Sequence, residues 1–504
     1  MVHHLAPLLL TVSLLLPVTA DATARWMIVD PPQGAVALAS GGTGAAELSG
    51  ITWAGGTQFF VVGDNAGVVF PLTVTLDASS GSITTAALSA GIALGVGSDP
   101  EGLAYDSVND SVYVGDESGP AIREHALADG SLLQTVAVPA VFSAYRPNLS
   151  LESLSRAPDG PLWTVNEEAL SVDGPVSSSS TGTTVRLQRF DSALVPAGQW
   201  AYVTDPIAGD IGAPGRDIEV SGVSDLVALN DNQLLVLERA LGVGLFRHRI
   251  YEVDFSTATD VSAEPDLTLA SYTAVTKVLL WEGFSAINFE GIALGPMLDG
   301  GARSLLLVSD NGGGVNQSLL ALTLLPAPAC TAAPLPGCAP AGASALTVVS
   351  KDGTRDKLVW TWRQGALPDL SVFGDPTAAG GQGFAVCLYD SAAGVPQLRL
   401  SAAVPRGAPW TASGTTAFDY VDRSGSADGV MKVVLRAGTG TAKLKVKAKG
   451  AALGVPAPPI SGTLLSRDPE ITVQFVDRDA PGQCLGATFS AAKREGADRL
   501  KSKF

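Results

Sequence analysis

A repeated motif in the first two-thirds of the chain constrains its fold more than any other sequence feature. Each copy has a small or acidic residue, then Gly or Ser, a short apolar run, a turn, a second apolar run and an acidic or Asn residue. The copies are centred on Gly50, Gly102, Ser153, Gly222 and Gly291, at intervals of 52, 51, 69 and 69 residues. The acidic residue after the second apolar run lies at a near-constant distance from the central Gly or Ser. It follows by 14 residues at Asp64, Asp116 and Glu167, by 16 at Glu238 and by 19 at Asp310.

Each copy has the sequence of a β-hairpin. The apolar runs are rich in Val, Leu, Ile and aromatic residues, and the turns between them contain Gly, Asn and Asp. Hairpins that recur every 50–70 residues, with further strand-like sequence between them, are typical of four-stranded propeller blades. A β-sandwich also has many short strands but does not predict a period. We therefore expect an all-β chain with a five- or six-bladed β-propeller, in which residues 25–46 and 319–326 close the ring, as a sixth, degenerate blade if there is one.

Composition and charge change near residue 327, where a Pro- and Ala-rich stretch reads as a linker over residues 328–344. Before residue 330 there are 12 Lys or Arg and 35 Asp or Glu, and after it 20 and 14. This asymmetry predicts two domains, a propeller over 25–327 and a second β domain over 345–504 that resembles a sandwich. In the second domain, Lys443, Lys445, Lys447 and Lys449 alternate with apolar residues, which favours a strand with one solvated face. The charged tail after Ser490 is expected to be frayed or a short helix.

The N-terminus reads as a secretory signal peptide over residues 1–20, with an apolar run over 5–18 and cleavage after Ala20. No later apolar run is long enough to span a membrane, so the mature chain is expected to have no transmembrane segment. A net charge of −17 argues against nucleic acid as a partner. The sequence therefore predicts an exported protein, periplasmic or extracellular, whose ligand is unknown.

Export permits disulfides among the four cysteines. Their positions favour a local pair and a distant pair, Cys330–Cys338 and Cys387–Cys484, although four cysteines allow three connectivities.

The motif residues also carry a family resemblance. Ser49-Gly50, Glu101-Gly102, Glu152-Ser153, Val236–Arg239, Asn288–Leu294 and Ser304–Asn311 together resemble the phytase-like family, also described by an esterase-like activity of phytase. The resemblance covers about residues 45–325 and implies a β-propeller. Calcium-dependent propeller phytases, similar in fold, hold phosphate with several Lys and Arg beside calcium ions. This chain departs from them, since Lys277 is the only lysine in the propeller half. The C-terminal region resembles an uncharacterised secreted bacterial β module.

The repeat places acidic residues at equivalent positions of successive blades, and the innermost strands of a propeller line one channel. Converging carboxylates repel one another, and a divalent cation relieves that repulsion. Calcium suits a site of carboxylate, amide and carbonyl oxygens, whereas zinc or copper would need softer ligands. The predicted metal ligands are Glu101, Glu152, Glu290, Asp64, Asp116 and Asp310, with amide oxygens from Asn65, Asn166, Asn288 and Asn311. The alternative is that these acids cap blade strands or pair with Arg.

Three further residues are candidate ligand-binding groups: Glu167, Glu238 and Arg239. An ion pair within its own blade is the expected role of Arg239, and anion binding is the alternative. The two histidines beyond the leader, His125 and His248, are expected to be structural. The sequence assigns no catalytic residue and leaves open whether the protein is an enzyme. The leading hypothesis is a calcium-dependent hydrolase of phosphate or carboxylic esters. The others are a non-catalytic binding propeller with a structural calcium ion, and an envelope scaffold.

Overall fold

The computed structural model divides the chain into two compact units, one over Ala24–Ala327 and one that contains Pro328–Phe504. It describes residues 25–504 except 31–32, 40–42, 65–66, 96–98, 159, 208–219, 231–232, 243–244, 256, 300–301, 311–315, 328, 368, 378–382, 415, 456–469 and 481. The predicted signal peptide lies outside the described residues. Within them, no helix is long and apolar enough to cross a membrane.

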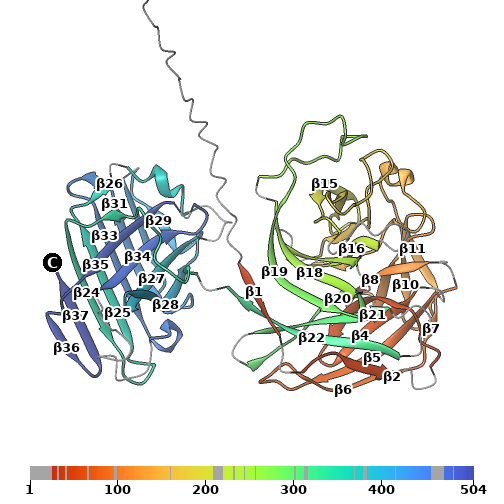
Figure 1. The fold of residues 1–504 in the computed structure, drawn as a ribbon, viewed down its shortest axis with the longest axis horizontal. Coiled ribbons are helices and arrows are strands. Elements are labelled where there is room, and N and C mark those ends of the chain that lie inside the picture. The colour runs from red at the N-terminus through yellow and green to blue at the C-terminus, as the bar shows by residue number, and fades with distance from the viewer. Residues whose placement is uncertain are drawn as a thin grey trace, which may run out of the picture. The chain divides into compact units, whose positions relative to one another are not determined.

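The first unit is a five-bladed propeller in the described residues (Figure 1). Each blade is an antiparallel sheet whose strands follow one another along the chain. The first blade has β3 (Leu48–Gly55), β4 (Gln58–Gly63), β5 (Val68–Leu76) and β6 (Ile83–Leu88), with β7 (Ile92–Ala93) also beside β5; the second has β8 (Pro100–Asp106), β9 (Ser111–Asp116), β10 (Ala121–Ala126) and β11 (Leu132–Val136). A short 3-10 helix, η1 (Ala140–Ala144), follows the second blade.

The remaining three blades have the same order. The third has β12 (Ser155–Arg156), β13 (Leu162–Val165), β14 (Thr184–Phe190) and β15 (Pro196–Val203); the fourth has β16 (Val220–Asn230), β17 (Gln233–Gly242), β18 (Leu245–Asp254) and β19 (Thr276–Ser285). The fifth has β20 (Asn288–Met297), β21 (Arg303–Asp310) and β22 (Asn316–Pro326).

The N-terminal segment closes the ring by completing the fifth blade. Both β1 (Trp26–Val29) and β2 (Val36–Ala39) pair with β22, in registers that join Trp26 to Pro326 and Ala39 to Asn316. Together they supply the outermost strand that β20, β21 and β22 lack. The prediction of a propeller is confirmed. The idea of a sixth blade is wrong, because β1, β2 and β22 belong to the same sheet as β20 and β21.

The small residue of each repeat lets adjacent innermost strands approach closely. A Cβ added to Gly50 would lie 2.3 Å from the carbonyl oxygen of Glu101, and one added to Gly291 would lie 2.3 Å from that of Ser49. Two residues further along, polar side chains link the blades. Thr52 Oγ1 accepts a hydrogen bond from the Tyr105 amide at 3.1 Å, and Ser155 Oγ accepts one from the Ala228 amide at 2.9 Å.

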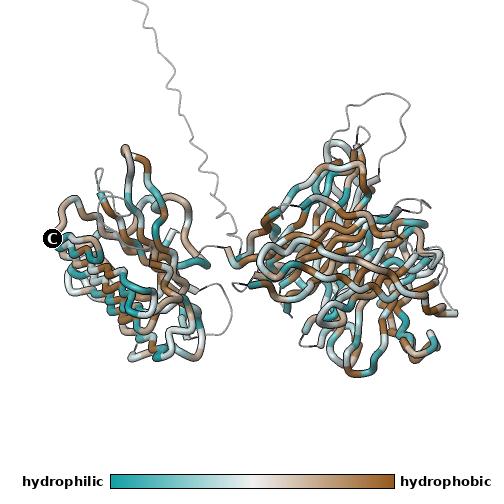
Figure 2. Tube along the Cα trace, turned by 90° about the horizontal axis from the view of Figure 1, so that it is seen from below, coloured by the Kyte–Doolittle hydropathy of each residue, from teal (hydrophilic) through white to brown (hydrophobic). Residues whose placement is uncertain are grey.

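Between the blades, apolar side chains form layers rather than one central core. One layer joins the first and fifth blades and includes Phe59, Phe70 and Leu306; another joins the third and fourth and includes Trp163 and Val236. Figure 2 shows hydrophobic stretches of the chain, in brown, throughout this unit. This sheet-on-sheet burial holds neighbouring blades together.

The second unit is a β-sandwich. One sheet has the order β23 (Ala339–Pro340), β35 (Cys484–Phe489), β34 (Ile471–Asp477), β27 (Phe384–Ala392) and β28 (Val395–Val404). The other has β29 (Trp410–Ala412), β30 (Ala417–Val421), β31 (Val430–Arg436), β33 (Lys443–Lys449), β25 (Lys357–Arg363), β24 (Ala343–Val349), β37 (Arg499–Lys503) and β36 (Arg494–Gly496). A small third sheet joins β26 (Ala366–Leu367) to β32 (Gly438–Thr439), and the 3-10 helices are η3 (Ser371–Phe373) and η4 (Ala451–Leu453). Trp360, Trp362, Phe384 and Phe475 lie in the core between the sheets.

Both favoured disulfide pairs are wrong. The structure joins Cys330 to Cys387 and Cys338 to Cys484. The expected linker is in fact fastened to the sandwich: besides the two disulfides, Leu335 exchanges backbone hydrogen bonds with the Gln474 side chain at 2.9 and 2.8 Å. A Pro-rich composition does not reveal that a segment packs along a sheet. The tail is likewise not frayed, because β37 pairs with β24.

Candidate metal and ligand site

A pocket of 530 Å³ lies where the innermost strands of the propeller begin. The motif glycines sit in or beside β-bulges of these strands: the pairing register shifts between Leu48 and Ile51, between Pro100 and Leu103, and between Phe289 and Gly291. A bulge locally turns a strand and re-aims its side chains. Glu101 and Glu290, which lie within two of these bulges, both line the pocket.

Most of the predicted site residues line this pocket. It contains Asp64, Glu101, Glu152, Glu167, Arg239, Asn288, Glu290 and Asp310, which come from all five blades. Asp116 and Glu238 are not among the lining residues. The Asp116 carboxylate instead accepts hydrogen bonds from Arg123 at 2.6 Å and Ser118 at 2.8 Å. The Glu238 carboxylate accepts from Tyr202 at 2.6 Å and Lys277 at 2.5 Å.

Of the four asparagines predicted to supply amide oxygens, two are described by the structure. Asn288 lines the pocket and donates to Glu290 at 2.9 Å. The Asn166 amide oxygen accepts from the Arg186 backbone at 2.9 Å, so it is engaged in the fold. Asn65 and Asn311 lie outside the described residues.

Three acids at the pocket were missed by the sequence argument: Asp99, Glu117 and Glu168. Carboxylate oxygens of Glu117, Glu152 and Glu167 all lie within 4.8 Å of one another, as do those of Asp99, Glu101 and Glu117. Glu117 is therefore common to both clusters. It directly follows Asp116, the last residue of β9. The consecutive acids of Asp116-Glu117 were the available signal, but spacing alone does not show which of the two lines the pocket.

Arg239 links three blades at the pocket. Its guanidinium donates to Glu167 of the third blade at 2.5 Å and to Glu290 of the fifth, while Arg239 itself lies on β17 of the fourth. The expectation of an ion pair within one blade is wrong, because β17 places this side chain toward the channel rather than along its own sheet. The Arg239 Nε is buried and has no hydrogen-bond partner among the described residues.

Burial strongly raises the pKa values of the acids around Arg239. It raises the pKa of Glu101 and of Glu152 well above the usual carboxyl range, and neighbouring carboxylates add to the effect. Burial also raises the pKa of Glu167 to about 7, although the adjacent Arg239 acts in the opposite direction. The pKa of Glu117 is raised by burial too, while a hydrogen bond from the Ser150 amide at 2.6 Å opposes the rise. Burial thus shifts each of these four acids toward its protonated form, and a bound cation would act in the opposite direction.

The donor set fits calcium. The residues that line the pocket offer carboxylate and amide oxygens and no thiol or imidazole in the described part of the chain. Because Arg239 already engages Glu167 and Glu290, the acids of the two clusters that are left for a cation are Asp99, Glu101, Glu117 and Glu152.

The two histidines are structural. His125 is buried, with Nδ1 3.0 Å from the Gly130 carbonyl oxygen. His248 Nε2 accepts a hydrogen bond from the Phe289 amide at 3.0 Å, which ties the fourth blade to the fifth.

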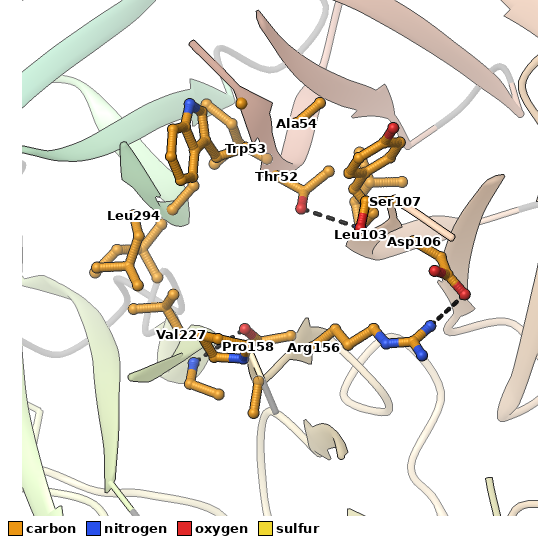
Figure 3. A pocket seen from close by; sticks show the side chains of 18 of the residues that line it. Thr52, Trp53, Ala54, Leu103, Asp106, Ser107, Arg156, Pro158, Val227 and Leu294 are labelled. Carbon is orange, nitrogen blue, oxygen red and sulfur yellow. Dashed lines mark hydrogen bonds and ion pairs between the residues drawn. The ribbon is translucent and has the colours of Figure 1, made fainter. Parts of the chain in front are cut away.

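A second pocket, of 510 Å³, lies where the same innermost strands end (Figure 3). Leu103, Val227 and Leu294 give it an apolar lining, and Trp53 stands at its edge. Arg156, which pairs with Asp106, reaches across one side. Asp106 is the one acid among its described lining residues, so this mouth lacks the donors of a metal site.

Comparison with known proteins gives one family. The family model "Phytase-like: Esterase-like activity of phytase" matches residues 43–313. No curated protein sequence matches the chain.

Solved structures give distant likenesses. A PQQ-bound aldose sugar dehydrogenase from Streptomyces coelicolor is 13% identical with a TM-score of 0.28, and the match covers 60% of this chain and 100% of that one. A calcium-binding regucalcin from Agrobacterium tumefaciens is 12% identical with a TM-score of 0.27, covering 61% and 97%. A calcium structure of a family AA12 enzyme from Trichoderma reesei is 12% identical with a TM-score of 0.29, covering 61% and 99%. Likenesses this weak assign no function.

Proposed function

Since the chain belongs to the phytase-like family, whose description is an esterase-like activity of phytase, we propose that it is an exported, calcium-dependent hydrolase of phosphate or carboxylic esters. Its site is the acidic pocket at the start of the innermost strands. One observation carries this proposal: the described residues that line the pocket include nine carboxylates and a single cationic side chain, Arg239. So many converging acids favour a divalent cation.

Glu101, Glu117 and Glu152, with Asp99 beside them, would hold the calcium ion. Bound there, calcium would neutralise the buried carboxylates and polarise a phosphoryl or carbonyl oxygen of the substrate. Of the proposed ligands, Asp99 is the most open to solvent, since the three glutamates are buried.

The other groups at the pocket would act directly on the substrate. Arg239 would orient an anionic or carbonyl oxygen, and its unpartnered Nε–H is a donor that such an oxygen would satisfy. Glu167, with a pKa raised to about 7, is suited to accept and return a proton near neutral pH. Arg239 Nη2 lies 2.5 Å from the Glu167 carboxylate and would position it.

Export completes the proposal. The leader over residues 1–20 reads as a signal peptide, and both disulfides need an oxidising compartment. A periplasmic or extracellular location also supplies free calcium.

Calorimetric titration of the mature protein with CaCl2 tests the metal site. Wild type is expected to bind, and Glu101→Gln, Glu117→Gln and Glu152→Gln are each expected to weaken binding at least ten-fold. Glu264→Gln, a charge loss at an exposed residue outside the pocket, is the matched control and should bind as wild type does. Binding that ignores all three pocket substitutions would refute the site.

Hydrolysis of p-nitrophenyl phosphate and p-nitrophenyl acetate, with CaCl2 or with a chelator, then tests the chemistry. Calcium-dependent turnover that Glu167→Gln abolishes without loss of calcium binding supports the proposal. Calcium binding without turnover of either ester would instead favour a non-catalytic binding propeller.

That second function has an observation in its favour. The only lysine of the propeller half, Lys277, is paired with Glu238 at 2.5 Å and Asp205 at 2.8 Å, away from the acidic pocket. A single guanidinium group, that of Arg239, binds a phosphate group only weakly. In this alternative, calcium is structural, and a ligand binds without being cleaved.

A further inference from the structure

The second domain carries a strongly cationic surface that the proposed function does not use. Five adjacent strands of its eight-stranded sheet, in the order β31, β33, β25, β24 and β37, contain no Asp or Glu. We define their outer side as the basic face. It opposes the side whose apolar residues, such as Val433, Leu444 and Trp360, are buried in the sandwich core.

The basic face is built by strict alternation along the strands. On β33, Lys443, Lys445, Lys447 and Lys449 are half-buried or exposed, while the three residues between them are buried. Protein surfaces normally intersperse both charge signs. Here every outward position of this strand is cationic.

The flanking strands extend the same charge. On one side, β25 adds Lys357 and Arg363 at its two ends, and beyond β24 the strand β37 adds Arg499, Lys501 and Lys503.

On the other side of β33, β31 adds Lys432 and Arg436, at half-exposed positions. Acids lie outside the five strands: Asp356 and Asp498 directly precede β25 and β37, and two others are on the neighbouring strands. Asp419 on β30 pairs with Arg436 at 2.5 Å, and Glu495 lies on β36. The centre of the face therefore has no carboxylate of its own.

The strand register sets like charges directly opposite one another. Lys449 faces Lys357, and Lys443 faces Arg363 across the pair β25–β33. Lys447 likewise faces Lys432 across β31–β33. Like charges in such positions destabilise a sheet. Along β33 itself, the positive charge of Lys447 lowers the pKa of Lys445. A merely solvated face would gain nothing from such an arrangement.

We propose that the basic face binds a linear acidic polysaccharide, a flexible chain with regularly repeated carboxylate, sulfate or phosphate groups. Same-side residues of one strand are about 6.6–6.8 Å apart, and neighbouring strands about 4.8 Å apart, so the cations form a grid that a single small anion cannot span. A repeating polyanion can engage many of them at once, with release of counter-ions.

The shape of the sheet separates this partner from two others. Adjacent strands twist by about 20–25°, so five strands turn through roughly 80–100°. A flexible polymer can follow that twist, whereas a flat bilayer touches only part of it. The five strands also present no aromatic side chain outward, since Trp360 and Trp362 are buried, so the face lacks the stacking platforms typical of single-stranded nucleic acid sites.

Binding of the full mature chain to heparin, a linear sulfated polysaccharide, tests the proposal. Wild type is expected to bind, with an affinity that falls steeply as salt rises. The double variant Lys445→Gln/Lys447→Gln is expected to bind at least ten-fold more weakly and with a smaller salt dependence. Its melting temperature should be unchanged or higher, because the substitutions relieve repulsion, so the loss cannot be ascribed to unfolding.

The matched control is Arg355→Gln/Arg423→Gln, which removes the same charge from exposed positions outside the five strands. It should bind heparin within two-fold of wild type. Equal loss in both double variants would mean that only net charge matters and would overturn the proposal. So would unaltered binding by Lys445→Gln/Lys447→Gln, or a preference for anionic phospholipid vesicles or poly(dT) over heparin.

Discussion

At the scale of single residues, burial shifts the pKa of buried acids and of the buried His248 in opposite directions. It favours the protonated form of Glu101 and Glu152, and it favours the neutral form of His248. His248 lies between Phe246 and Phe289, with ring centroids 6.0 and 5.4 Å away. Burial, aided by the positive charge of Arg239, lowers the pKa of His248 to about 3.

This histidine should make the propeller sensitive to acid. In the unfolded chain His248 binds a proton below about pH 6.5, but in the folded chain only below about pH 3. The unfolded state therefore holds more protons in this window, and stability is lost as the pH falls through it. We expect wild type to lose about 1.4 kcal/mol of unfolding free energy per pH unit more than His248→Gln between pH 6 and 4. Denaturant unfolding at each pH measures the difference, and parallel profiles would contradict it.

Particular residues show which parts of the site could be predicted from the sequence. The repeat put Asp64, Glu101 and Glu152 at equivalent blade positions, and all three line one pocket. The repeat offsets chose Asp116 where the pocket takes Glu117, because the hairpin from Leu103 to Val114 is one residue longer than the hairpin from Ile51 to Val61 in the first blade. Arg239 was assigned to its own blade for a similar reason: partners in other blades, 72 and 51 residues away, leave no local pattern.

At the scale of elements, the innermost strands owe their close packing to the small residue of each repeat. The sequence predicted hairpins because alternation and turns are local. It expected residues 25–46 and 319–326 to close the ring. It left open whether they form a separate blade, because the pairing of β1 and β2 with β22 depends on contacts between the two ends of the propeller.

A glycine substitution tests this close packing. Gly50→Ala should destabilise the propeller by about 2–4 kcal/mol, because the new Cβ would lie 2.3 Å from the Glu101 carbonyl oxygen and the strands would have to separate. Gly119→Ala is the control, since its Cβ would meet nothing within 4 Å, and it should leave stability within about 0.5 kcal/mol of wild type. Thermal and chemical unfolding compare the two variants. Similar stability of both would show that the blades tolerate wider spacing than we infer.

At the scale of the whole molecule, the two units differ in what stabilises them. The propeller has no cysteine in its sequence and closes its ring with backbone pairing. The sandwich has both disulfides, which join residues 57 and 146 positions apart. Cys330 and Cys338 attach the segment that enters the domain to two strands of the same sheet, β27 and β35.

Reduction should therefore act on one unit. A disulfide across a loop of this length restricts the unfolded chain, so less conformational entropy is lost on folding. Reduction is therefore expected to lower the unfolding free energy of the sandwich by about 2–5 kcal/mol. Scanning calorimetry with and without a reducing agent should show one transition at lower temperature and a propeller transition that does not move. A downward shift of both transitions would mean that the units unfold together.

The closure of the ring by β1 and β2 has a consequence for the order of events during synthesis. Trp26 pairs with Pro326, 300 positions later in the chain. At about 5–20 residues per second, a ribosome needs roughly 15–60 s to make the intervening sequence. Until then the first-made strands have no sheet to join, and β22 does not yet exist. Ring closure therefore cannot precede the synthesis of β22, and a chain released before residue 326 would keep an open sheet edge, a template for aggregation.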